Sequence, residues 1–157
     1  MGIKFKPAAE PGPVPAPAPA PQCDKRITIS DVKSSGYQPT FPPANAIDNN
    51  PNTKWWSINI PNPWIRLALG GQKQVCRVDI AWGDATQYHF NISVSTDGSN
   101  FTDVLTGKIR TGTTPALESY TFPVTQTSDI RITITESTPG ATNSIAQISE
   151  VAVFSNA

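Results

Sequence analysis

Apolar and polar residues alternate along most of the chain after residue 23. Residues 65–69, 78–82, 90–94 and 130–134 each carry a large apolar side chain at every second position. Successive side chains of a β-strand point to opposite faces, so this period of two is typical of half-buried antiparallel strands. No segment shows a sustained period of 3.6, which would indicate a helix. The pattern therefore predicts an all-β fold.

Turn-forming residues separate the alternating runs. They occur at residues 70–71, 97–100, 111–115 and 139–140, where Gly, Pro, Asn and Asp gather. Seven or eight short strands at this spacing predict one antiparallel sandwich. Between Ile148 and Val151 the apolar parity slips by one residue, which predicts a β-bulge that redirects Glu150.

The first 22 residues differ from the rest of the chain. Proline and alanine dominate residues 7–21, a composition that favours extended polyproline II and gives nothing to bury. We predict a linker or tail over residues 1–22 and a folded domain over residues 23–157. A linker implies a larger multidomain or surface protein; the alternative is a cloning remnant. Residues 1–6 are basic but lack the apolar core of a signal peptide, so we expect an excised piece or a missing leader.

Composition and charge exclude two kinds of partner. The 157-residue chain has 12 basic and 12 acidic residues, a formal net charge of zero, and therefore lacks the basic excess of a nucleic-acid-binding protein. A membrane-spanning helix needs about 18 or more consecutive apolar residues. No stretch approaches that length, so we expect no transmembrane segment.

The two cysteines, Cys23 and Cys76, are far apart in the sequence. Cys76 shares the parity of Val78 and Ile80, which predicts a buried side chain. Two isolated cysteines without CxxC spacing do not suit zinc. We predict a Cys23–Cys76 disulfide and hence an extracellular or cell-surface location, with two free buried thiols as the alternative.

Residues 45–56 combine turn-forming residues with oxygen-bearing side chains. Pro51 prevents a helix here, so Asp48, Asn50 and Thr53 are expected in a tight loop. Such a loop can direct several oxygens inward, which suits a hard cation such as calcium. The sequence itself leaves open a simpler interpretation, an Asx-rich turn between two strands.

Six motifs follow one another at residues 45–55, 63–70, 75–82, 92–101, 130–132 and 148–151. In this order they resemble the discoidin or coagulation factor 5/8 type C domain. More narrowly, they resemble family 32 carbohydrate-binding modules found beside alginate lyases and on archaeal and bacterial surface proteins. The resemblance covers residues 23–155. It implies an eight-stranded antiparallel jelly-roll sandwich with loops gathered at one end.

The resemblance also implies a structural calcium ion. Side-chain oxygens would come from Asp48, Thr53 and Glu150. Backbone carbonyls would come from Asn45, Asn50, Thr53 and Ser149. Many relatives carry Asp where this chain has Asn50, but that position supplies its carbonyl, so the departure is tolerable.

Sugar-binding sites combine flat aromatic faces with a few polar groups. The candidate ligand-binding residues are Tyr37, Trp56, Asp84, Gln87, Tyr88, His89, Arg110 and Asn143. Trp55, Trp64 and Trp82 are expected in the core. Trp56 is either exposed for stacking or packed under a neighbouring loop. His89 fits the start of a strand better than a binding role.

Two loops depart from the lyase-associated relatives. Residues 83–89 contain no Lys or Arg, and residues 138–145 contain no aromatic residue. We therefore expect a neutral sugar, or protein contacts, in preference to a polyuronate.

Three classes of function remain in order of preference. We predict a non-catalytic module that binds a glycan or cell-surface polysaccharide. The alternative is an adhesion or assembly module that binds protein through the same loops. An enzyme is disfavoured, because the adjacent Tyr88 and His89 would point to opposite faces of a strand and the chain has no second histidine.

Overall fold

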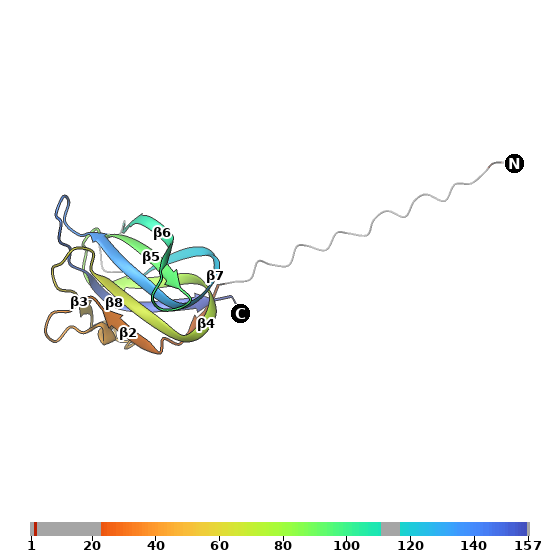
Figure 1. Ribbon diagram of the computed structural model, residues 1–157, viewed down its shortest axis with the longest axis horizontal. Coiled ribbons are helices and arrows are strands. Elements are labelled where there is room, and N and C mark those ends of the chain that lie inside the picture. Colours follow the sequence, from red (N-terminus) through yellow and green to blue (C-terminus); the bar gives the residue numbers. More distant parts are fainter. Residues whose placement is uncertain (1, 3–22, 111–116, 157) are drawn as a thin grey trace.

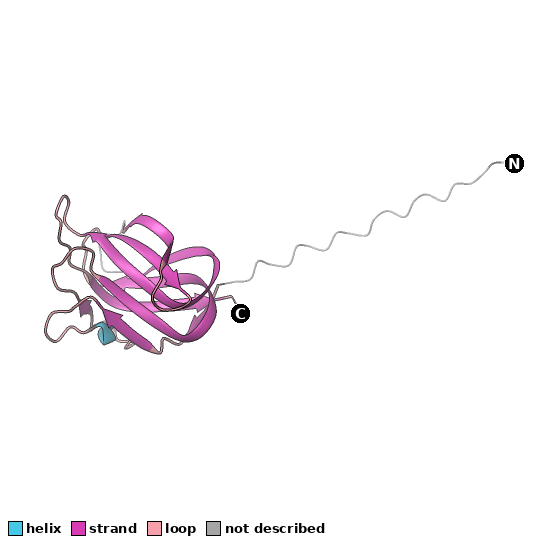
Figure 2. Ribbon diagram, viewed as in Figure 1, coloured by secondary structure: helices cyan, strands magenta, loops and turns pink. Residues whose placement is uncertain are grey.

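The computed structural model describes residue 2, residues 23–110 and residues 117–156. Apart from Gly2, the predicted linker 1–22 lies outside the described residues, as does the predicted turn at residues 111–115. The elements are β1 Lys25–Ile27, β2 Asp31–Ser34, the 3₁₀ helix η1 Pro43–Ala46, β3 Trp55–Trp56, β4 Trp64–Trp82, β5 His89–Ser95, β6 Thr102–Ile109, β7 Leu117–Glu136 and β8 Gln147–Ser155. The predicted all-β class is confirmed (Figure 2).

The strands form one antiparallel sheet in the order β1-β8-β4-β7-β5-β6, with β2 added to β4 and β3 added to β8. β4 and β7 are 19 and 20 residues long and pair along most of their length. The first part of β4 pairs with β2, and the last part pairs with β8. Each long strand therefore belongs to both layers of a folded-over sheet (Figure 1).

The core lies between the layers and follows the predicted parity. Ile65 and Leu67 of β4 pair with Ile132 and Ile130 of β7, and all four side chains are buried, as are Leu69 and Ile134. Trp55 and Trp82 are also buried, as predicted. Trp64 is half-buried, so its predicted place in the core is wrong; it lies at the very start of β4, where less sheet covers it.

The predicted turn at Gly70-Gly71 is a corner inside β4. The register with β7 shifts between Ala68 and Lys73, and the strand continues on the other side. Gly70 and Gly71 have φ values of 73° and 144°. Residues with a side chain rarely adopt these angles, so the glycine pair lets β4 bend from one layer into the other.

The predicted β-bulge in β8 is confirmed. Ala81 of β4 pairs with Glu150, but the next residue, Trp82, pairs with Ile148. Ser149 is therefore the extra residue on β8. The bulge lets Ile148 and Val151 both reach the core, while Glu150 is half-buried and faces the loop between η1 and β3.

The Cys23–Cys76 disulfide is confirmed, with the two Cα atoms 6.0 Å apart. It ties Cys23, two residues before β1, to the middle of β4. Arg77 supports the same junction, since its Nη1 donates to the carbonyl of Cys23 at 2.8 Å. The amino end of the short strand β1 is thereby fixed by the disulfide, and the strand itself by its pairing with β8.

Removing the disulfide should destabilise the domain. For the double variant Cys23→Ala/Cys76→Ala we expect the free energy of unfolding to fall by about 4 kcal/mol, because the cross-link restricts the unfolded chain over 53 positions. Denaturant titration of the oxidised wild type and the variant measures the difference. The reduced wild type is the control and should behave like the variant; coinciding curves for all three would contradict the prediction.

Candidate functional site

Three connections meet at one end of the sandwich and surround a pocket of about 320 Å³, which we call the rim pocket. They are the segment after β3, the β4–β5 loop and the β7–β8 loop, and they lie at the end of the domain away from the carboxyl end of β8 (Figure 1). Ile60 and Ser144 form a β-bridge that joins the first of these connections to the last. The fold therefore holds loops that are distant in sequence around one space.

The rim pocket brings together half of the predicted ligand residues: Trp56, Asp84, Tyr88 and Asn143. Trp56 is partly covered: the ring of Phe41 meets it edge-on at 5.1 Å, and Lys54 Nζ lies 4.9 Å from its centre. Its indole Nε1 is buried and has no hydrogen-bond partner among the described residues. Trp56 therefore lines the pocket while its indole N–H remains an unsatisfied buried donor.

The carboxylate of Asp84 organises the β4–β5 loop. Its Oδ1 accepts from the Tyr88 hydroxyl at 2.6 Å, and its Oδ2 accepts from Thr86 Oγ1 at 2.8 Å and Gln147 Nε2 at 3.1 Å. Burial, followed by this hydrogen bond, raises the pKa of Tyr88 well above its ordinary value, so its hydroxyl stays a neutral donor. The hydrogen bonds of Asp84 thus stabilise the β4–β5 loop itself.

Tyr88 is 1% exposed and stacks on Trp82 with ring centres 4.8 Å apart. It lines the pocket with only a small part of its surface. Its main role is to join the β4–β5 loop to the core, because its hydroxyl is fixed by Asp84 and its ring by Trp82.

Arg110 lies inside the domain, which corrects its prediction as a direct ligand contact. Its side chain is fully buried, Nη1 donates to the carbonyls of Asp84 and Thr86, and Nε lies 3.6 Å from Glu118 Oε1. A buried guanidinium needs such acceptors, and loop carbonyls need such donors. Arg110 therefore shapes the rim from below.

The other three predicted ligand residues lie outside the rim pocket. Tyr37 is half exposed on a neighbouring loop, Gln87 is exposed, and His89 begins β5, as its strand-flanking interpretation predicted. Sequence reasoning missed polar residues that line the pocket, including Asn59, Thr86, Ser137, Thr138 and Gln147. A usable signal existed for Gln147, a polar residue at the start of an apolar strand, where it can reach both neighbouring loops.

The loop between η1 and β3 gathers the predicted calcium ligands. Thr53 Oγ1 lies 3.1 Å from the carbonyl of Asn50, 3.5 Å from that of Asn45, and hydrogen-bonds to Asp48 Oδ2. Asp48 Oδ1 also accepts from the backbone of Asn50 at 3.0 Å, which forms an Asx-turn. Four oxygen-bearing residues therefore converge on one point of the loop.

Glu150 completes this cluster from β8. Its Oε1 accepts from the backbone N–H of Asn49 at 2.5 Å, and its Oε2 is buried without a hydrogen-bond partner among the described residues. Burial, and to a lesser degree the nearby Asp48 carboxylate, raises the pKa of Glu150. Ser149, the bulged residue, lies directly before it. Among the described residues no three His, Cys, Asp or Glu side chains cluster, so a cation here would depend on carbonyl and hydroxyl oxygens as well.

Residues 28–151 match the family model of the F5/8 type C domain. The chain belongs to the F5/8 type C domain family. No curated protein matches the chain. The match to a family model covers most of the described residues, and it confirms the resemblance drawn from the six motifs.

Solved structures of F5/8 type C relatives share the fold. The family 32 module of AlyQ in complex with 4,5-unsaturated mannuronic acid is 35% identical, with a TM-score of 0.72 over 82% of this chain and 97% of that one. A pectin-binding carbohydrate-binding module has 23% identity and a TM-score of 0.72 over 81% and 91%. A family 32 module from Clostridium perfringens, in complex with GalNAc-β-1,3-galactose, has 20% identity and a TM-score of 0.70 over 80% and 94%.

These neighbours are carbohydrate-binding modules, a non-catalytic class of domain, although some are attached to enzymes. In one structure such a module occurs together with an alginate lyase domain, and this chain covers 32% of that protein. The F5/8 type C domain described here is accordingly a non-enzymatic module with a carbohydrate-binding fold. No helix in its described part is long and apolar enough to cross a membrane.

The buried Arg110 of this F5/8 type C domain should be essential to the rim. We expect Arg110→Met to lower the free energy of unfolding by about 3 kcal/mol, because it removes a donor from the carbonyls of Asp84 and Thr86 and the cation from Glu118. Chemical denaturation measures the change. The matched control is Arg131→Met, which removes only a half-buried guanidinium stacked on Phe101 and should cost about 1 kcal/mol or less. Equal losses would show that Arg110 is not a special support.

Proposed function

We propose that this domain is a non-catalytic glycan-binding module whose ligand sits in the rim pocket. The observation that carries the proposal is the combination, in one pocket of about 320 Å³, of the Trp56 ring with amide and hydroxyl groups from three loops. Sugar rings present C–H faces to aromatic surfaces and hydroxyls to planar polar groups. The pocket supplies both kinds of surface side by side.

The ligand groups that the pocket can bind are neutral. Asp84 is the one charged side chain among its described lining residues, and its carboxylate is already occupied by Tyr88, Thr86 and Gln147. Lys54 does not line the pocket; its Nζ lies over the Trp56 ring and donates to Gln147, so its charge is already partnered. The relatives bind both kinds of ligand, an unsaturated mannuronic acid in one and GalNAc-β-1,3-galactose in another. The charge of this pocket favours an uncharged sugar.

The module acts, in this proposal, outside the cell and as one part of a larger protein. A buried disulfide persists in oxidising compartments, and the chain has one between Cys23 and Cys76. The Pro/Ala-rich residues 1–22 have the composition of a semi-rigid spacer. Together these features suit a binding module tethered to another domain or to a surface.

The loop between η1 and β3 would hold a structural calcium ion in this proposal. Support comes from the convergence of Asn45, Asp48, Asn50 and Thr53 oxygens and from the buried, unpartnered Oε2 of Glu150. Calcium prefers six to eight oxygen ligands of this mixed kind. When bound, the ion would neutralise the two neighbouring carboxylates and join the loop to β8. Ser149, next to Glu150, would contribute its carbonyl.

Glycan binding should depend on Trp56. We expect Trp56→Ala to weaken binding of a neutral glycan by about tenfold or more, since it removes the stacking surface of the pocket. A glycan array identifies the ligand, and isothermal titration of wild type and variant measures the loss.

Tyr37→Ala is the matched control for this experiment. Tyr37 is the more exposed aromatic but lies outside the rim pocket, so its removal should change the affinity by less than about twofold. Equal losses for both variants would place the ligand elsewhere on the loops. A flat array, together with specific binding to a protein, would replace the proposal with the adhesion alternative.

Calcium should stabilise the folded domain. A ligand that binds only the folded state adds about 2.7 kcal/mol at a hundredfold excess over its dissociation constant, so calcium should raise the melting temperature and a chelator should lower it. Glu150→Gln should abolish the difference between the two conditions. Asp103→Asn, an exposed carboxylate on β6, is the control and should preserve it. Identical melting curves of the wild type with calcium and with chelator would remove the ion from the proposal.

A further inference from the structure

Two adjoining hollows flank β1 along the part of β8 from Val151 to Ser155. The first, of about 280 Å³, lies toward the loop between η1 and β3; the second, of about 260 Å³, lies toward the corner of β4. They share Arg26, Ile27 and Thr28, so they are neighbouring parts of one surface, which we call the β1 surface. The rim pocket includes Gln147 and the second hollow includes Ser155, the two ends of β8. At 3.3 Å per residue these ends are about 26 Å apart.

The residues that line the β1 surface include basic but no acidic side chains. Lys25, Arg26 and Lys73 line the second hollow, and none of the described residues lining either hollow is acidic. Within the described part of the chain, neither Lys25 nor Lys73 has an ion pair, and both are exposed. The chain as a whole is neutral, with 12 residues of each sign. Lys25 and Lys73 are therefore two exposed cations of this surface that form no ion pair with a described residue.

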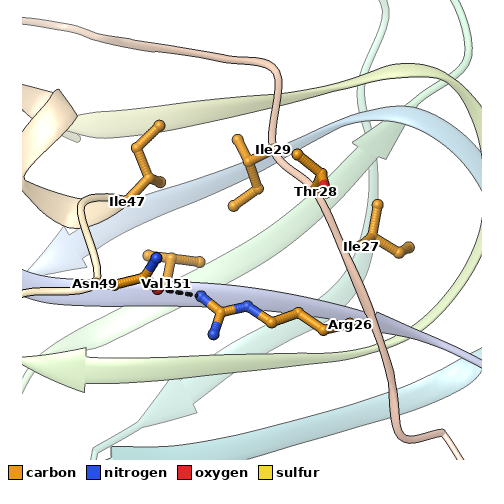
Figure 3. A pocket seen from close by; sticks show the side chains of 7 residues that line it. All are labelled: Arg26, Ile27, Thr28, Ile29, Ile47, Asn49 and Val151. Atoms are coloured by element: carbon orange, nitrogen blue, oxygen red, sulfur yellow. Dashed lines mark hydrogen bonds between the residues drawn. The ribbon is translucent and has the colours of Figure 1, made fainter.

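Arg26 is held in place between the hollows. Its Nη2 donates to Asn49 Oδ1 at 2.8 Å, and Figure 3 shows its side chain extended along β8 toward that contact. A guanidinium has five N–H donors, and this contact uses one of them. Arg26 also interacts electrostatically with the Glu150 carboxylate, which offsets part of the positive charge of Arg26. Asp24 precedes Lys25 in the sequence, and Asp48 precedes the lining residue Asn49.

The first hollow adds an apolar floor to this charge. Ile29, Ile47 and Val151 come from three different segments and lie around the same space, with the Arg26–Asn49 contact at one edge (Figure 3). A sugar ring has apolar C–H faces, and an acidic sugar adds a charged group at its edge. In the first hollow the apolar floor can contact the C–H face of the sugar, and the Arg26 guanidinium can contact its acidic group. Lys25 and Lys73 in the second hollow can contact the acidic group of the next sugar in a polysaccharide.

We propose that the β1 surface is a second binding site, which takes an acidic polysaccharide through its repeated anionic groups. Arg26 binds an anionic group in the first hollow, while Lys25 and Lys73 bind the next in the second. The spacing of cations over two adjoining hollows suits a polymer with repeated charges better than a single small anion. This site is independent of the rim pocket, because the two share no residue.

The experiment compares oligogalacturonate, dextran sulfate, neutral dextran and a single-stranded DNA oligonucleotide of similar length as probes on the intact chain. We expect oligogalacturonate to bind, more weakly as salt is added, and neutral dextran not to bind to this surface. Lys25→Gln/Lys73→Gln should weaken oligogalacturonate binding about tenfold, and Arg26→Gln about threefold or more. Binding of dextran sulfate alone, with the same loss in the variants, would assign the site to sulfated polysaccharides.

Lys33→Gln/Lys108→Gln is the matched control, since it removes the same charge from exposed lysines on β2 and β6. It should leave the binding unchanged, and Trp56→Ala should also leave it unchanged. Lys25→Gln/Lys73→Gln should in turn retain neutral-glycan binding at the rim, so failure of one site is distinguishable from failure of the other. Equal losses in both lysine pairs, or DNA binding as tight as oligogalacturonate binding, would overturn the proposal, because either would show general attraction of polyanions. The melting temperature of each variant establishes that it is folded.

Discussion

The pairing of β4 with β7 is the interaction on which the rest of the molecule depends. The two strands pair from Trp64 opposite Thr133 to Ala81 opposite Leu117, across the corner made by the glycines at 70 and 71. Because both strands pass through both layers, each contributes alternate apolar side chains to both sides of one core. Every other strand adds to an edge of this pair directly or through one neighbour. The corner must therefore bend without losing register, which is why glycine is needed there.

This framework determines where loops can meet. β8 lies beside the second half of β4, and β3 pairs with the first residues of β8, so Trp55 lies opposite Ile148. That pairing brings the loop before β3 beside the bulge after Ile148 and puts Asn49 in hydrogen-bond contact with Glu150. The same edge carries the connections that enclose the rim pocket. One strand thus positions two chemically different clusters, since its bulge turns Glu150 outward without displacing Val151 from the core.

Much of this arrangement was predictable, and the failures have physical causes. Alternation identified the strands whose one face is buried, and the parity of Cys76 predicted its burial. The disulfide was predicted because two isolated cysteines without CxxC spacing do not suit zinc. β6 was not predicted, because it is an edge strand whose residues are mostly exposed and show no apolar alternation. Arg110 was assigned to ligand binding because sequence patterns treat an arginine beside loops as exposed. Its burial depends on carbonyls of the 84–86 segment, whose conformation comes from tertiary contacts alone.

The distribution of charge explains why a neutral chain can carry two sites of different character. In the rim pocket the Asp84 carboxylate accepts hydrogen bonds from Thr86, Tyr88 and Gln147. The pocket therefore presents hydroxyls, amides and an aromatic ring, and no unpaired charge, to a ligand. Along β1 the cations have few partners, and their attraction extends to about 8 Å at physiological ionic strength. The nearer hollow is lined by Val151, four residues along β8 from Gln147 of the rim pocket, or about 13 Å, which is longer than that distance. In the proposed scheme the two sites therefore bind independently, and a polysaccharide long enough to occupy both would gain avidity.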